Sequence, residues 1–470
     1  MAESKEKSGL LYQAARHKNL SELVDNLLYH DAELGLYSLA WFKKFYNELI
    51  EKNILDEYAI CYFNIRHLGI LNQSLRREEV NHLIIAFTNG LEVICEPEGT
   101  VARVSGGDFL AIFRRSVIDQ VREYLEGTVL NYGKEMNNSV LIAAIAGVFP
   151  IPENNIDAES AIDLASWAYK EARAGSKQFL VFDEDLSKIR ENKEMVEASF
   201  PNALINNEFK VYYQPKVNVK NYTLVGAEAL CRWFHNGTMI RPDEFIPVLE
   251  QNHSICSLDY YMLDHVCADI RKWIDEGKPV VKVSVNFSRL HLGNIYLFKQ
   301  IMDIIDSHRV PHEYIEIELT ETTTDANFSD LKRIVELLQK NGISTSIDDF
   351  GCGYSSLNLM RSLPWDVLKI DKSFLKDTIE GGSHSNSVLS HVISMAQEQG
   401  IECIVEGVET IEHLNLIKEN NCFLAQGFLF DKPLPKDEFE ERLKGAMEEI
   451  RKAVKAGIRK MNIGSLITYM

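Results

Sequence analysis

The chain has 470 residues, which predicts two or three domains at about 100 to 200 residues each. Hydrophobic residues make up 46% and charged residues 25%, an ordinary globular composition with enough apolar mass for large cores. The 69 acidic and 50 basic side chains give a net charge of −19, which argues against a protein that coats nucleic acid or anionic lipid through bulk charge.

The first 200 residues are expected to form a mixed domain followed by a connector. Residues 1–30 are predicted as a helical lead and residues 31–185 as an α+β domain. Helices are expected at Leu75–Asn89 and Ser116–Leu125. Residues 186–200 are charged and contain no glycine or proline, which predicts a linker helix rather than a flexible tether. The expected strands are Tyr58–Asn64, Leu91–Cys95, Phe109–Phe113, Val140–Gly147 and Phe179–Phe182.

Residues 201–445 show a different pattern, in which strand-like segments recur and most are followed by a predicted helix. Such alternation indicates parallel βαβ units, and eight of them indicate a closed α/β barrel of the TIM-like (β/α)8 class. The runs are Lys210–Pro215, Leu224–Leu230, Val280–Phe287, Ile315–Glu321, Ile343–Phe350, Val367–Asp371, Ile401–Gly407 and Phe423–Phe430.

Cysteine use and hydropathy indicate a cytoplasmic protein. None of the eight cysteines forms a CxxC pair, which favours reduced thiols. The chain shows no signal-peptide-like apolar run near its start and no stretch of about 20 apolar residues, so no membrane span is expected. Residues 446–470 are predicted as a basic amphipathic tail helix. It is expected to pack on the barrel, with contact to anionic membrane or a partner as the alternative.

Polar residues end the strand-like runs of the predicted barrel. In a barrel of this class the carboxyl ends of the strands form the active face. Any one of these residues could instead cap a helix or lie at the surface, but six strands with the same property favour a shared site. Oxygen ligands suit Mg²⁺ or Mn²⁺, and paired metals are a recurring device for attack on a phosphodiester. The residues are Glu228, Asn286, Glu318, Glu321, Asp348, Asp349, Lys369, Asp371, Glu406, Glu409 and Gln426.

Two further features have two interpretations each. The segment FGCGYSSL after Asp349 is either a mobile loop that closes over a ligand or a tight connection. Arg232, four residues after Glu228, either grips a phosphate or forms an ordinary surface ion pair.

Eight ordered motifs in the second half resemble the EAL domain of cyclic di-GMP phosphodiesterases. The resemblance covers about residues 195–445 and implies a TIM-like barrel with one strand antiparallel to the others. It also implies hydrolysis of cyclic di-GMP to linear pGpG with two Mg²⁺ or Mn²⁺ ions. The motifs are YYQPKV, GAEALCRW, VSVNFS, ELTE, IDDFGCGYSSL, LKIDKSF, VEGVE and AQGF.

The same resemblance implies roles for individual residues. The metal ligands it implies are Glu228, Asn286, Glu318 and Asp348, with Asp348 bridging, and Asp349 as a ligand of the second metal or of water. Lys369 and Glu406 would position and deprotonate the attacking water, with the choice of base left open. Glu321 would order the DDFG loop. The supports of the metal–water site are Glu409 and Gln426, and the substrate contacts are Gln214, Arg232 and Glu228. Cys352 and Val405 depart from the usual Thr and Ala without removing a ligand.

Residues 31–185 resemble a GGDEF domain, the diguanylate cyclase fold, in degenerate form. The signature R-Y-G-G-D-E-F aligns with Arg103–Phe109, so that Gly107 stands at its first acidic position. Asn64 replaces the metal-binding aspartate, whereas Asn72 remains at the guanine-contact position. Because GTP condensation needs carboxylates to hold two Mg²⁺ ions, no cyclase activity is expected. Glu96–Gly99 does not match the inhibitory RxxD motif, so product feedback is not expected there.

These resemblances predict a phosphodiesterase whose first domain regulates or dimerises. Packing and homodimer formation are favoured for that domain, and weak GTP binding through Asn72 is the alternative. For the whole chain, one rival is a catalytically idle receptor for cyclic di-GMP, and another is a bifunctional cyclase and phosphodiesterase. Retention of the barrel residues argues against the first rival, and the altered signature argues against the second.

Overall fold

The computed structural model describes residues 27–133, 137–153, 156–320, 328–351, 356–375 and 383–444. The chain divides into two compact units, Met1–Glu191 (unit 1) and Asn192–Met470 (unit 2). The boundary falls inside helix α7, Glu184–Ile205, so the predicted linker is part of a 22-residue helix. No helix in the described ranges is long and apolar enough to cross a membrane. The predicted tail helix, Glu321 and Cys352 lie outside the described residues.

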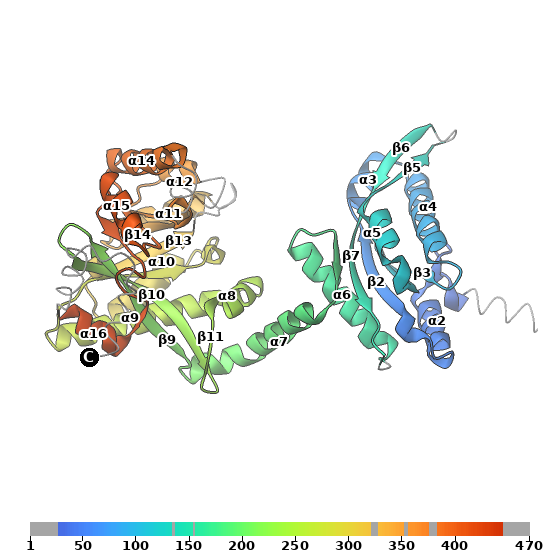
Figure 1. The fold of residues 1–470 in the computed structure, drawn as a ribbon, viewed down its shortest axis with the longest axis horizontal. Helices are drawn as coiled ribbons and strands as arrows, with labels where there is room; N and C mark the ends of the chain where they lie inside the picture. The colour runs from blue at the N-terminus through green and yellow to red at the C-terminus, as the bar shows by residue number, and fades with distance from the viewer. Residues whose placement is uncertain are drawn as a thin grey trace, which may run out of the picture. The chain divides into compact units, whose positions relative to one another are not determined.

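Unit 1 is a six-stranded sheet in the order β1-β3-β4-β2-β7-β8, with a separate β5–β6 hairpin (Figure 1). Its strands are β1 Tyr37–Ser38, β2 Tyr58–Ile65, β3 Thr100–Ser105, β4 Asp108–Arg114, β5 Thr128–Tyr132, β6 Asn138–Ile142, β7 Ala144–Pro150 and β8 Phe179–Val181. Its helices are α2 Leu39–Glu51, α3 Leu68–Ser74, α4 Arg77–Cys95, α5 Ile118–Glu126 and α6 Ala158–Ala174.

The central strand β2 is buried on both faces, because successive side chains point to opposite sides of a sheet. Ala59, Cys61 and Phe63 pack with α4 and α5, whereas Tyr58 and Ile60 pack with α2 and α6. Unit 1 is therefore a three-layer arrangement with helices on both faces of the sheet.

One strand prediction in unit 1 is wrong, and another joins two separate strands. Leu91–Cys95 is the last part of α4, because Phe87, Leu91 and Cys95 are buried at helical spacing along one face. Val140–Gly147 is divided between β6 and β7 at Ala143, whose carbonyl accepts a hydrogen bond from Arg66. The prediction also missed β1, β3 and β5, which are short or half-exposed strands.

Unit 2 is a closed eight-stranded barrel surrounded by helices (Figure 1). Its barrel strands are β9 Phe209–Asn218, β10 Thr223–His235, β12 Lys282–Phe287, β13 Ile315–Thr320, β14 Ser344–Phe350, β15 Val367–Ile370, β16 Glu402–Val405 and β17 Leu424–Ala425. Neighbours from β10 to β17 pair in parallel, and β9 closes the ring by pairing antiparallel with both β10 and β17. The α/β barrel with one reversed strand is confirmed.

The remaining elements of unit 2 cover the barrel and extend its edges. They are β11 Thr238–Ile240, β18 Leu434–Pro435, α8 Pro242–Gln251, α9 Ile255–Asp275, α10 Leu297–Ser307, α11 Phe328–Lys340, α12 Ser356–Ser362, α14 Ser383–Glu398, α15 Ile411–Glu419 and α16 Lys436–Leu443. A continuous apolar core joins these helices to the barrel strands, which fixes the strand ends relative to one another.

Candidate active site

Strand register places the predicted polar residues in one layer at the barrel mouth. Glu228 of β10 stands opposite Gln214 of β9, and Asn286 of β12 stands opposite Glu318 of β13. Asp348 of β14 stands opposite Thr320, which is two residues after Glu318 on β13. Because side chains alternate along a strand, residues two apart on each strand face the same interior.

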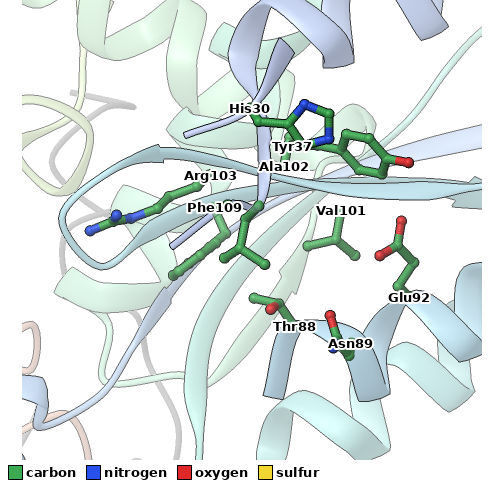
Figure 2. A pocket seen from close by; sticks show the side chains of 11 residues that line it. His30, Tyr37, Thr88, Asn89, Glu92, Val101, Ala102, Arg103 and Phe109 are labelled. Atoms are coloured by element: carbon green, nitrogen blue, oxygen red, sulfur yellow. The ribbon is translucent and has the colours of Figure 1, made fainter. Parts of the chain in front are cut away.

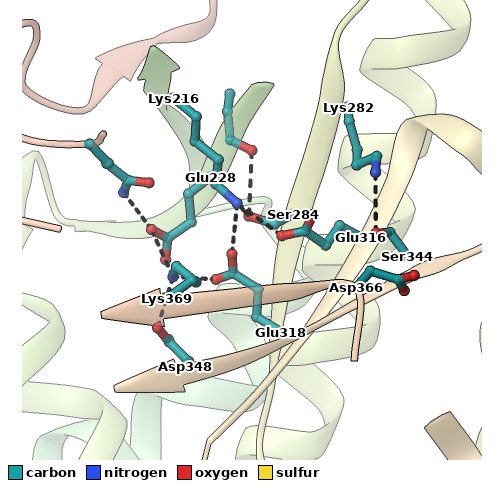
Figure 3. Close-up of polar contacts among 12 residues, drawn as sticks. Lys216, Glu228, Lys282, Ser284, Glu316, Glu318, Ser344, Asp348, Asp366 and Lys369 are labelled. Carbon is teal, nitrogen blue, oxygen red and sulfur yellow. Dashed lines mark hydrogen bonds and ion pairs between the residues drawn. The ribbon is translucent and has the colours of Figure 1, made fainter. Parts of the chain in front are cut away.

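Lys369 of β15 lies at the centre of the buried acidic cluster (Figure 3). Its Nζ atom is 2.7 Å from Glu318 Oε2 and 2.8 Å from Glu406 Oε1. The same atom is 2.9 Å from Asp348 Oδ1 and 3.4 Å from Glu228 Oε2. One buried ammonium thus neutralises part of the charge of four carboxylates, which would otherwise repel one another.

Amide side chains orient Glu228. Gln426 donates through Nε2 to Glu228 Oε2 at 2.6 Å, and Asn286 donates through Nδ2 to Glu228 Oε1 at 2.8 Å. Gln426 also donates to Gln214 Oε1 at 3.1 Å, which ties β9 to the same network. The Oε1 atom of Gln426 is buried without a hydrogen-bond partner among the described residues. A buried polar atom in that state suits a further ligand at this point.

Burial and charge shift the carboxyl groups in different directions. Burial raises the pKa of Glu318, but the Lys216 and Lys369 ammonium charges outweigh burial and lower the pKa to about 2. Burial raises the pKa of Glu406 to about 8, although Lys369 opposes this. The pKa values of Glu228 and Asp348 are also raised, chiefly by burial. For Lys369 the surrounding carboxylates outweigh burial and raise its pKa well above the usual range.

The carboxylates fall into two overlapping groups that could hold metal ions. Ligand atoms of Glu228, Glu318 and Asp348 all lie within 4.8 Å of one another, as do those of Asp348, Asp349 and Glu406. Asp348 belongs to both groups, which is the arrangement that a ligand shared by two metals requires. The oxygen-only donor set fits Mg²⁺ or Mn²⁺.

A cavity of 260 Å³ adjoins this cluster. Asp348 and Asp349 lie on its wall together with Asn286 and Arg232. Asp349 adopts a left-handed φ of 53°, a strained backbone conformation that occurs preferentially at functional sites. The Arg232 guanidinium lies over the Tyr212 ring and donates to the Cys231 carbonyl, and burial lowers its pKa.

Glu409, Asp371 and Asn72 are the other predicted residues that the structure describes. Glu409 is exposed, and its backbone N–H donates to His413, with no contact to the acidic cluster among the described residues. Asp371 accepts a hydrogen bond from the Ser373 N–H, so it caps the turn after β15. Asn72 of α3 belongs to unit 1, where it lines a cavity of 480 Å³.

The sequence prediction missed a second buried lysine with its partners. Lys216 of β9 donates to Ser284 Oγ at 2.8 Å, Glu318 Oε1 at 2.9 Å and Glu316 Oε1 at 3.0 Å. A lysine inside the apolar run YYQPKV and a glutamate two residues before Glu318 were the available signals, since both face the barrel interior.

In unit 1, Asn64 of β2 donates to Asp108 Oδ1 of β4 at 2.8 Å. A second cavity, of 210 Å³, lies between β3 and α4, and Glu92 of α4 points into it beside Asn89 (Figure 2). Burial raises the pKa of Glu92.

A family model described as the EAL domain matches residues 197–433. The chain is 28% identical over 88% of its length to the Cyclic di-GMP phosphodiesterase NbdA of Pseudomonas aeruginosa. It is 26% identical over 91% of its length to MucR of the same organism, named a bifunctional diguanylate cyclase and cyclic di-GMP phosphodiesterase. These matches cover 54% and 62% of the two relatives, so the chain spans little more than half of their length.

Among solved structures, the fold is similar to the S helix–GGDEF–EAL part of Vibrio cholerae LapD bound to c-di-GMP. The TM-score is 0.52 at 17% identity, and the match covers 89% of this chain and all of that chain. At this identity the similarity describes the fold alone.

Proposed function

The chain belongs to the EAL domain family, and from this premise we propose that unit 2 hydrolyses cyclic di-GMP to linear pGpG. The observation that supports this proposal best is the pair of carboxylate groups sharing Asp348, next to a cavity lined by Arg232. In the reaction one water adds across one P–O3′ bond, which leaves a 5′-phosphate and a free 3′-hydroxyl on a linear dinucleotide.

The proposed metal ligands are Glu228, Glu318 and Asp348 for one ion and Asp348 and Asp349 for the other. Asn286 adds its amide oxygen, because its Nδ2 atom already faces Glu228. Bound Mg²⁺ or Mn²⁺ would supply positive charge that offsets the phosphate and the charge developing on it.

The proton chemistry is assigned to Lys369 and Glu406. Lys369 lies among four carboxylates and stays an ammonium, so it acts as a hydrogen-bond donor that stabilises negative charge. Glu406, which lies 2.8 Å from it, is then the group that accepts the proton of the attacking water. Arg232 would bind a phosphate oxygen of the dinucleotide at the cavity wall.

The direct test incubates the full chain with cyclic di-GMP and Mg²⁺ or Mn²⁺, and separately with GTP, and separates the products by chromatography. We expect pGpG from the first incubation and no cyclic di-GMP from the second. Glu228→Gln should lower the rate by a factor of about 10² or more, because it removes a carboxylate at the centre of the network. The matched control is Glu402→Gln, which changes an exposed carboxylate at the opposite end of β16 and should keep the wild-type rate.

Other outcomes would overturn the proposal in defined ways. Tight binding of cyclic di-GMP without turnover would mean that the chain is a receptor. Cyclic di-GMP formed from GTP would mean that unit 1 is an active cyclase.

For unit 1 we propose a degenerate GGDEF domain that packs and dimerises rather than one that condenses GTP. Asn72, Arg77 and Arg103 line its 480 Å³ cavity, but Arg77 pairs with Glu33, and Arg103 pairs with Glu33 and Asp31. Arginine side chains that are already paired with carboxylates attract a triphosphate only weakly. Titrating GTP into the full chain should give no heat at millimolar nucleotide, and saturable binding abolished by Asn72→Ala would instead support nucleotide sensing.

A further inference from the structure

Lys216, Ser284 and Glu316 form a polar group that lies deeper in the barrel than the proposed metal ligands. The Lys216 partners Ser284 and Glu316 stand two residues before Asn286 and Glu318 on the same strands, and all three are buried. Because side chains two apart on a strand face the same interior, these three groups lie next to the mouth layer on its inner side. Figure 3 shows the contacts that Lys216 makes with Ser284, Glu316 and Glu318.

Glu318 is the contact between the two layers. Its Oε1 atom accepts from Lys216 Nζ at 2.9 Å, and its Oε2 atom accepts from Lys369 Nζ at 2.7 Å. A carboxylate with one oxygen fixed by each of two buried ammonium groups has its plane and direction defined. Lys369 is surrounded by mouth carboxylates, whereas the partners of Lys216 among the described residues are Ser284, Glu316 and Glu318.

Lys216 lies on β9, the strand that closes the barrel by pairing with β10 and β17. Lys216 comes from the first strand of the barrel and reaches Glu318, which follows it by 102 positions in the chain. Buried charges persist where they are paired and hydrogen-bonded, and this lysine has three acceptors within 3.0 Å.

We propose that Lys216 is a positioning residue for the metal site: it holds Glu318 Oε1 from below so that Oε2 faces the cluster of Glu228 and Asp348. This inference rests on the proposed function, because it takes Glu318 as a metal ligand. Partners that orient metal ligands in this way are worth about 10- to 100-fold in metal affinity.

The test compares two variants of the full chain that differ at position 216 alone. Glu316→Met keeps the contact between Lys216 and Glu318, and the double variant Lys216→Met/Glu316→Met removes it. The double change removes one positive and one negative charge, so the net charge stays as in the wild type. Replacing a buried ion pair by apolar side chains of similar volume is commonly tolerated.

Mn²⁺ binding to chelator-treated protein is measured by titration calorimetry, with unfolding temperature as a second readout. We expect Glu316→Met to keep wild-type Mn²⁺ affinity and the double variant to bind Mn²⁺ about 10- to 100-fold more weakly at temperatures below its own unfolding transition. Lys216→Gln/Glu316→Met keeps an amide donor at position 216 and should recover part of the Mn²⁺ affinity. If the double methionine variant does not fold, this glutamine variant is compared with Glu316→Met in its place.

Equal Mn²⁺ affinity in Glu316→Met and the double variant would overturn the proposal, since Lys216 would then serve only to neutralise Glu316. The matched control is Lys278→Met/Glu440→Gln, which removes an ion pair elsewhere in unit 2 and should keep wild-type affinity. A wild-type chain that binds Mn²⁺ but leaves cyclic di-GMP intact would refute the proposed function and leave the Lys216 comparison valid.

Discussion

Replacing Lys369 by methionine tests how the buried acidic cluster is neutralised. Four carboxylates lie 2.7 to 3.4 Å from Lys369 Nζ. At an effective dielectric constant of about 20, each such pair contributes roughly 5 to 6 kcal/mol before desolvation. Burial of the ammonium offsets much of this, and removal of one partner from a buried charge set costs a net of about 3 to 5 kcal/mol.

The assay is differential scanning calorimetry with chelator and then with Mn²⁺. In chelator the barrel transition of Lys369→Met should fall by roughly 6 to 20 °C, given about 2 to 4 °C per kcal/mol for a unit of this size. Mn²⁺ should raise the variant's transition more than that of the wild type, because divalent cations replace the missing positive charge. The exposed pair of Lys332 and Glu336 provides the control, and Lys332→Met should change stability by less than about 1 kcal/mol.

An unchanged barrel transition of Lys369→Met in chelator would refute this reasoning. It would mean that the carboxylates are protonated or separated in solution and that Lys369 does not compensate their charge. An equal loss of stability with and without Mn²⁺ would contradict the idea that metal and lysine neutralise the same carboxylates.

Two further predictions concern unit 1. Gly147→Ala should destabilise unit 1 by about 1 to 3 kcal/mol, because an added Cβ would lie 2.0 Å from Tyr169 N and 2.4 Å from Ala165 O; an unchanged calorimetric transition would contradict this close packing of α6 on β7. Burial raises the folded-state pKa of Glu92 above its unfolded value, so its contribution to stability is present at low pH and lost as pH rises through the folded pKa. Glu92→Gln should therefore stabilise unit 1 by about 0.5 kcal/mol at pH 8 and have no effect at pH 4, and equal effects at both pH values would exclude the titration of Glu92 as the cause.

Local sequence patterns predicted most of the barrel and the mouth residues that end its strands. Glu228, Asn286, Glu318 and Asp348 end runs of strand-like residues, and parallel strands in a closed barrel bring such ends together. Leu91–Cys95 was misassigned because a short run of β-branched and apolar residues fits a strand or a buried helix equally well. Only the packing of its buried positions against the sheet decided for helix.

Part of the chain's negative charge lies in the acidic cluster of the barrel. The sequence by itself determined that oxygen ligands gather at the ends of consecutive strands, since that depends on spacing within each segment. The tertiary structure decided which charges meet: Lys216 contacts Glu318, and Lys369 contacts four carboxylates that lie on other strands or directly after one. Such pairings depend on the register between neighbouring strands of the sheet, and for Lys216 on the pairing of β9 with β10 and β17 that closes the barrel.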